Sequence, residues 1–178
     1  PCCENFSWSP DSNYVSYTAN QSNVVDAYLW NRTTGTRTVL DSAGPTNVLH
    51  NAWSPNGQKL AFFGDKQSGQ SDSAWRKLYV ANNNGGDATL VSGTMSSGGS
   101  FTNFVSLVFN QRSYRPAWSP DSSRYLYAAD KNIDGVLELF AANADGSRNI
   151  KVSEAVATGT GIDGHGFGWS GDGKKVTY

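Results

Sequence analysis

The sequence predicts an all-β fold, a β-propeller of four-stranded antiparallel blades, with about three and a half blades in this chain. The first observation is a phrase, Trp-Ser-Pro-Asp-Ser or a close variant, that begins at Trp8, Trp53, Trp118 and Trp169. The second is an aromatic residue nine positions after each of these tryptophans. The tryptophans are 45 to 65 residues apart. Repeated units of this length with apolar faces cannot bury those faces alone, so they stack on copies of themselves.

Composition supports strands and excludes several functions. Aromatic residues make up 12% of the chain, and Gly, Ser and Asn are abundant, which favours strands joined by tight turns. Fourteen basic and fifteen acidic residues leave a formal charge of −1, without the basic excess needed for nucleic acid or an anionic membrane. No apolar run is long enough to span a bilayer.

We expect a single propeller over residues 1–178, with repeat units at about 6–49, 50–114, 115–166 and an incomplete 167–178. Each unit begins with a strand that ends in the repeated Trp, and a polar turn is expected at 20–23. Alternation of apolar and polar residues predicts the following strands at 14–19, 27–30 and 36–40, at 59–63, 77–81 and 88–91, at 124–129, 137–142 and 149–152, and at 174–178.

Two segments interrupt the repeat. Residues 64–76 form a long polar loop, and residues 93–115 form a connection that begins with Gly and Ser and then turns apolar. The pattern within 101–109 fits a helix and a strand equally well. Because loops on a rigid scaffold carry specificity, we expect these inserts to contact a partner through Trp75, Phe101, Phe104 and Phe109.

The strand count predicts a partial ring. Three units and half of a fourth give about fourteen strands, whereas four closed blades need about sixteen. Too few residues precede Trp8 to supply the missing strands. The chain is then part of a protein with more blades, or it belongs to an assembly whose partner completes the open edges.

The repeated phrase, followed by an apolar strand and then by Leu-Tyr-Val-Ala-Asn at 78–82, resembles the WD40-like (PD40-type) repeat of bacterial TolB-like propellers. The resemblance covers nearly the whole chain except residues 93–114 and the cysteine terminus. It implies the fold, but the same repeat occurs in periplasmic scaffolds, peptidase propeller domains and some polysaccharide lyases. The chain departs from the pattern at Gly171, which replaces Pro, and at Ser12 and Ser122, which replace a turn glycine.

One loop has the spacing of a calcium site. The segment 130–138 reads Asp-x-Asn-x-Asp-Gly-x-x-Glu, which places oxygen-bearing side chains at alternate positions before a bend. The candidate ligands are Asp130, Asn132, Asp134 and Glu138. The alternative is an ordinary polar hairpin that binds no metal.

Other candidate residues are isolated. His165, near Asp163, and His50 precede Trp phrases and could face a ligand or partner at the channel mouth, or could bond to loop backbone. Trp30 and Trp75 could stack on sugars or on a partner. No nucleophile elbow, P-loop or dinucleotide fingerprint occurs in the sequence.

The two cysteines, Cys2 and Cys3, are neighbours and are poorly placed to bond to each other. They could form a disulfide to a partner, attach a metal or lipid, or remain thiols.

Three functions fit the sequence. The first is a non-catalytic protein-binding or scaffold module of an exported bacterial propeller, located in the periplasm or outside the cell. The second is the propeller domain of a larger peptidase or polysaccharide lyase, and the third is a subunit of an extracellular structural assembly. The absence of a catalytic motif favours the first.

Overall fold

The structure, a computed structural model, describes residues 6–21, 24–40, 46–65, 77–86, 88–93, 117–132, 136–154, 162 and 166–178. The regular elements within these residues are strands. They are β1 (Phe6–Trp8), β2 (Tyr14–Gln21), β3 (Val24–Asn31), β4 (Arg37–Val39), β5 (Thr46–Trp53), β6 (Lys59–Asp65), β7 (Lys77–Asn82), β8 (Thr89–Leu90), β9 (Ala117–Trp118), β10 (Arg124–Ala129), β11 (Glu138–Asn143), β12 (Asn149–Lys151), β13 (Gly168–Trp169) and β14 (Val176–Thr177).

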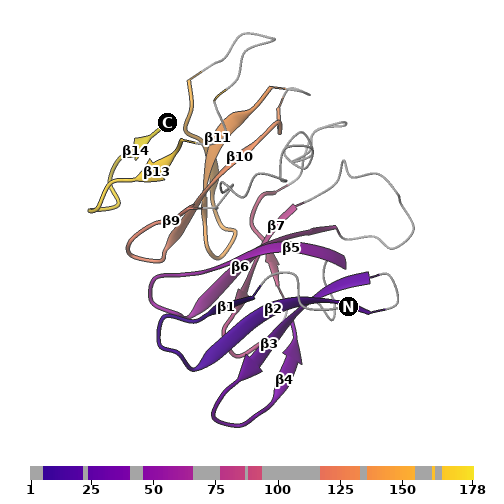
Figure 1. The fold of residues 1–178 in the computed structure, drawn as a ribbon. Helices are drawn as coiled ribbons and strands as arrows, with labels where there is room; N and C mark the ends of the chain where they lie inside the picture. Colours follow the sequence, from indigo (N-terminus) through magenta and orange to yellow (C-terminus); the bar gives the residue numbers. More distant parts are fainter. Residues whose placement is uncertain are drawn as a thin grey trace. The chain divides into compact units, whose positions relative to one another are not determined.

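The strands form three four-stranded antiparallel sheets and one two-stranded sheet, each in sequence order (Figure 1). We call β1–β4, β5–β8 and β9–β12 the first, second and third blades, and β13–β14 the half blade. This confirms the expected all-β propeller architecture of about three and a half blades. Nothing in the described part of the chain forms a helix of the length and apolarity that a membrane span requires.

Each Trp phrase folds into the same tight turn. In the first blade the Ser9 hydroxyl donates to Asp11 Oδ1 at 2.5 Å and accepts from the Tyr14 backbone nitrogen at 2.9 Å. The same pair of bonds recurs at Ser54, Ser119 and Ser170. Ser12 and Ser122 adopt a positive φ here, at 58° and 62°, where the other two copies carry glycine. The repeated phrase therefore encodes one local structure.

Two stretches differ from the prediction. Residues 20 and 21 were expected in a polar turn, but Asn20 and Gln21 are in β2 and pair with Val25 and Val24 of β3. The strand before Trp53 is longer than expected, since β5 begins at Thr46, and it contains register shifts on both sides of Leu49. Such irregularities bend a strand locally, and this one was not visible in the pattern of apolar residues.

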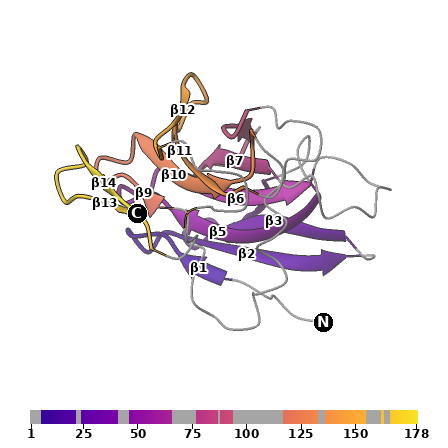
Figure 2. The same ribbon diagram turned by 90° about the horizontal axis from the view of Figure 1, so that it is seen from above.

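The chain divides into two compact units, one of residues 1–70 and 78–90 and one of residues 71–77 and 91–178. In the first unit, the face of the second blade that carries Trp53 packs on the first blade, whose β1 lies beside β5 (Figure 2). The shared core contains Ala27, Leu29, Leu40, Val48, Leu60, Phe62, Tyr79 and Ala81.

The second unit repeats this arrangement. The face of the half blade that carries Trp169 packs against Leu126, Leu139 and Ala141 of the third blade. We call the Trp-bearing face of each sheet its leading face and the opposite face its back face. In both units, the leading face of the later sheet covers the back face of the sheet before it.

The repeated Trp also joins the sheets by a hydrogen bond. Trp53 Nε1 donates to the Ser7 carbonyl at 3.2 Å, and Trp169 Nε1 donates to the Ala117 carbonyl at 2.9 Å. In each case the acceptor is the residue before the Trp of the preceding sheet. The indole therefore fixes the position of one blade on the next, as well as filling the space between them.

Candidate functional site

Antiparallel order places two kinds of connection at opposite ends of each blade. In the third blade, the tight turns after β9 and β11 lie at one end, and the β10–β11 connection and the segment after β12 lie at the other. We call this second end the loop-bearing end, because in the second and third blades the long connections leave from this end of the sheet. Long loops on a rigid scaffold commonly carry binding residues, so this end of the sheets is the candidate binding site.

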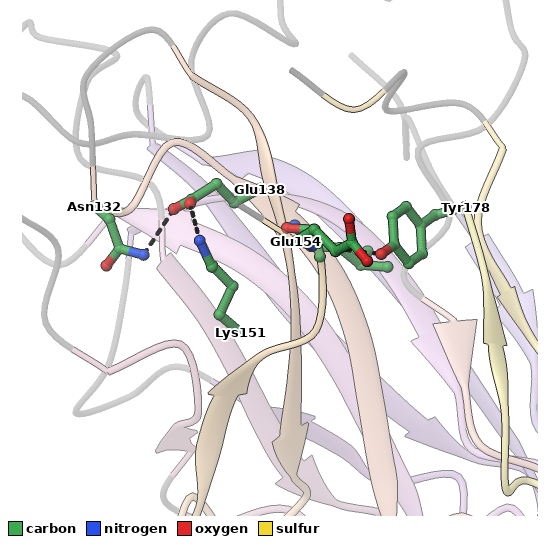
Figure 3. A network of polar contacts seen from close by, with 7 residues as sticks. Asn132, Glu138, Lys151, Glu154 and Tyr178 are labelled. Atoms are coloured by element: carbon green, nitrogen blue, oxygen red, sulfur yellow. Dashed lines mark hydrogen bonds and ion pairs between the residues drawn. The ribbon is translucent and has the colours of Figure 1, made fainter. Parts of the chain in front are cut away.

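Glu138 is the centre of a polar network at this end (Figure 3). Its side chain is 3% exposed, and Lys151 Nζ lies 2.7 Å from Oε1. Asn132 Nδ2 donates to Oε2, also at 2.7 Å. Glu138 begins β11 and Lys151 ends β12, so strand pairing brings them together. Both carboxylate oxygens of a buried acid therefore have polar partners, as burial of a charge requires.

Two further charged side chains flank this network. Asp130 is buried, at 2% exposed, and follows β10 directly. Lys131 Nζ lies 5.3 Å from the centre of the Phe140 ring, a cation–π distance. Burial lowers the pKa of Lys131 from its ordinary value. With Glu138 and Lys151, the cluster has two acidic and two basic side chains, so its charges balance.

The connection between β8 and β9 begins with two residues that are hydrogen-bonded to the third blade. Tyr127 donates its hydroxyl hydrogen to the Ser92 carbonyl at 3.2 Å, and Asn149 Nδ2 donates to the Val91 carbonyl at 2.8 Å and to Tyr127 Oη at 2.6 Å. Tyr127 is 1% exposed, and burial raises the pKa of its phenol. Residues 91–92 are therefore held by the third blade just before the 93–115 insert begins.

The connection between β12 and β13 is hydrogen-bonded to neighbouring residues near its start and further along. After β12, the Leu139 backbone nitrogen donates to the Ser153 hydroxyl at 3.1 Å, and the Glu154 nitrogen donates to Tyr178 Oη at 3.4 Å (Figure 3). Further along, the Ile162 nitrogen donates to the Leu137 carbonyl at 3.1 Å. The loop-bearing end of the third blade thus fixes the flanks of both connections that border it.

In the predicted calcium loop, the Lys151 ammonium group is bound to the carboxylate of Glu138, one of the candidate calcium ligands. Asp130, Asn132 and Glu138 lie at the same end of the third blade, but Lys151 and Asn132 already occupy the Glu138 carboxylate. Among the described residues no group of three His, Cys, Asp or Glu side chains is placed to hold a metal. Asp134, the remaining candidate ligand, lies outside the described residues. Calcium would have to displace Lys151, and its binding stays a prediction.

Several other predicted site residues also lie outside the described residues. They are Trp75, Phe101, Phe104, Phe109, Asp163, His165, Cys2 and Cys3. His50 is in β5, next to the register shift at Leu49. The predicted roles of these residues remain predictions.

Sequence reasoning did not identify Lys151, Asn149 or Tyr178 as part of this end. Lys151 and Asn149 belong to β12 and Tyr178 directly follows β14, so the partner of each depends on how strands pair and pack. The alternation of the third unit places Lys151 and Glu138 on neighbouring strands, but a shift of one residue would separate them. Opposite charges on adjacent predicted strands were the available signal.

No family model and no curated protein matches the sequence. Solved structures do match. TolB from Acinetobacter baumannii has 16% identity and a TM-score of 0.55 over 96% of this chain, and a TolB candidate from Agrobacterium tumefaciens has 19% identity and a TM-score of 0.57 over 97%. The β-propeller domain of the Trilobed protease from Pyrococcus furiosus has 12% identity and a TM-score of 0.56 over 86%.

The fold is that of the TolB-type β-propellers. At these identities the likeness concerns the fold alone, and the TolB-type fold also occurs in the protease propeller. This chain spans 36%, 52% and 43% of the three matched chains, in the order given.

Proposed function

We propose that this chain is a non-catalytic protein-binding module of an exported TolB-type propeller, acting in the bacterial periplasm or outside the cell. The partner binds the loop-bearing end, through the inserts 64–76 and 93–115. The observation that carries this proposal is the anchoring of residues 91–92 by Tyr127 and Asn149. Val91 and Ser92 are buried, and a connection that starts from buried, hydrogen-bonded residues presents its side chains from a fixed point, which lowers the ordering cost of binding.

The polar cluster at the loop-bearing end of the third blade supports the same proposal. The Glu138 carboxylate is occupied on both oxygens, and its charge is balanced by Lys151. A general acid or base needs a carboxylate that can reach a substrate proton, and this one is 3% exposed and ion-paired. The cluster is therefore suited to holding the loop-bearing end rigid.

A photoreactive amino acid at single positions tests this proposal in cells that produce the protein. We expect discrete protein adducts when it replaces Phe104 or Trp75, and none when it replaces Thr34, an exposed residue in the tight turn after β3 at the opposite end of the first blade. Equal adducts from Thr34, or none from Phe104 and Trp75, would contradict the proposal. Fractionation of the same cells tests export.

The propeller domain of a larger peptidase is the alternative, supported by the fold shared with the Pyrococcus furiosus protease propeller. Its test is the intact mass of the native protein together with peptide hydrolysis. A mass well above 19.1 kDa with peptidase activity would favour this alternative over the binding module.

A further inference from the structure

Two asparagines of the second blade, Asn56 and Asn84, are each followed by a glycine. Glycine has no side chain to shield its backbone nitrogen, so that nitrogen can attack the side-chain amide of the asparagine before it. The asparagine is then lost as aspartate or isoaspartate. In a folded protein this reaction depends on how firmly the asparagine side chain and the following nitrogen are held, and the two sites differ in this respect.

The Asn56 side chain is held in the tight turn of the second Trp phrase. Its Oδ1 accepts from the Ser54 hydroxyl at 2.8 Å and from the Gln58 backbone nitrogen at 3.0 Å. The Gly57 nitrogen, which would have to attack, donates to the Ser54 carbonyl at 2.8 Å. Reaction at Asn56 would break these three bonds and open the turn, so the fold protects this site.

The Asn84 side chain is not held in this way. Asn84 lies in the turn between β7 and β8 and is exposed. Among the described residues its side chain has no hydrogen-bond partner. The Gly85 nitrogen donates to the Asn82 carbonyl at 3.1 Å, a longer bond than the one that holds Gly57. The side-chain amide of Asn84 is therefore free to rotate toward the nitrogen that follows it.

The corresponding turn of the third blade carries an aspartate at this position. Asp145 Oδ1 accepts from the Ser147 backbone nitrogen at 2.9 Å and from its hydroxyl at 2.6 Å. In the second blade Gly86 stands in the place of Ser147, so the turn has no hydroxyl to hold Asn84. The comparison also shows that this turn accepts an aspartate without a change in its path.

We propose that Asn84 is a site of spontaneous deamidation, and that its isoaspartate product loosens the packing of the second blade on the first. The Gly85 nitrogen loses its proton and bonds to Asn84 Cγ, the Cγ–Nδ2 bond breaks, and ammonia leaves with that proton. Water then adds to one of the two carbonyl carbons of the cyclic imide and breaks the bond from that carbon to nitrogen, which takes a proton from the water. Cleavage at Cγ gives aspartate, and cleavage at the backbone carbonyl carbon gives isoaspartate.

The isoaspartate product affects packing because Gly85 lies close to the first blade. A side-chain carbon placed on Gly85 would lie 2.6 Å from Thr38 Cγ2 of β4. Isoaspartate adds a methylene group to the backbone just before this glycine, so the turn cannot keep both its path and its contact with Thr38. Aspartate leaves the backbone as it was. This proposal is independent of the binding function of the inserts.

Peptide mapping by mass spectrometry, after incubation of the folded protein at mildly alkaline pH, tests the modification. We expect the peptide with Asn84 to gain one mass unit and to separate into aspartate and isoaspartate forms. Asn56 should react at least about tenfold more slowly, since two hydrogen bonds hold its side chain. In urea that unfolds the protein, the two sites should react at similar rates. Equal rates in the folded protein, or an unreacted Asn84 over the time that the unfolded chain needs, would overturn the proposal.

Two variants at the same position test the effect on packing. Asn84→Asp has the composition and charge of the isoaspartate form with an ordinary backbone, and Asn84→Gln keeps an amide that cyclises slowly and should stay unmodified. Hydrogen exchange of the β4 amides should be several-fold faster in the chromatographically separated isoaspartate form than in Asn84→Asp. Equal exchange in these two proteins would overturn the loosening. Circular dichroism confirms that all three are folded.

Discussion

At the scale of single residues, the serine hydroxyl of each Trp phrase closes the turn, because it both donates and accepts a hydrogen bond. It accepts from a backbone nitrogen five residues on and donates to an oxygen two residues on. In three copies that oxygen belongs to an aspartate, and in the second copy it belongs to Asn56. The residue two positions after the serine therefore needs an oxygen that accepts a hydrogen bond, and the turn forms whether or not this residue is charged.

The charge makes three of the turns sensitive to acid. The hydrogen bond from Ser119, followed by bonds from Ser123, lowers the pKa of Asp121 from 3.8 to about 2. Hydrogen bonds from Ser9 and Ser170 likewise lower the pKa of Asp11 and Asp172. A carboxylate whose pKa is lower in the folded state stabilises the fold above its unfolded pKa, and this stabilisation is lost as pH falls through the folded pKa.

We predict that Asp121→Asn keeps the turn but removes its share of this acid sensitivity, since Asn56 already fills the same role in the second blade. The urea midpoint of the wild type relative to the variant should fall as pH is lowered from about 4 to about 2, and should be constant at higher pH. Asp121→Ala, which cannot accept the bonds, is the control and should be destabilised even at neutral pH. A midpoint difference that does not change with pH would contradict the lowered pKa.

The tryptophans provide a second residue-scale prediction. Trp53→Phe should lower the free energy of unfolding by about 1 kcal/mol or more, because it loses the bond to the Ser7 carbonyl and part of the packing. Trp8→Phe should have an effect near zero in dilute solution, since Trp8 is 49% exposed. Urea denaturation of both variants at low concentration measures the difference. Equal effects would show that the repeated indole does not act through the interblade bond.

At the scale of elements, the end of β10, the start of β11 and the end of β12 form one polar unit around Glu138. Lys151→Met leaves this carboxylate buried without its cation. Because Lys151 is 33% exposed, we expect a loss of about 1–3 kcal/mol, below the range for fully buried pairs. The double variant Lys151→Met, Glu138→Gln should recover most of the loss, since residue 138 then carries no charge that needs a cation. A double-mutant cycle by urea denaturation measures the coupling, and additive effects would exclude it.

Calcium binding can be separated from this ion pair. If Asp130, Asn132, Asp134 and Glu138 bind calcium, the ion must displace Lys151, so Lys151→Met should bind calcium several-fold more tightly than the wild type. Glu138→Gln should bind least. Isothermal titration calorimetry with calcium chloride measures all three proteins, with magnesium as the competing ion. Absence of heat from Lys151→Met would rule out this loop as a calcium site.

At the scale of the whole molecule, the chain divides into two compact units, and in each of them one sheet packs its Trp-bearing face on the sheet before it.

The sequence was sufficient for the architecture because each blade is specified locally. Trp53, the turn after it and the aromatic Phe62 occur in fixed register, and these determine the strands they join. The polar unit was less predictable, because Glu138 and Lys151 meet only when β11 and β12 pair in one register. The prediction of a turn was wrong for Asn20 and Gln21, which pair within β2 and β3, because polar residues of this kind are typical of turns.

The interblade indole bond also sets an order of events during folding. The serine hydroxyl bonds to a backbone nitrogen five residues away, whereas the Trp53 indole bonds to a carbonyl 46 residues away. About three doublings of loop length separate these closures, which corresponds to roughly 2 kcal/mol of additional chain entropy. Local hairpins therefore form before any two blades dock. Trp53 reports the later step, so its fluorescence should change after the secondary structure of its hairpin has formed.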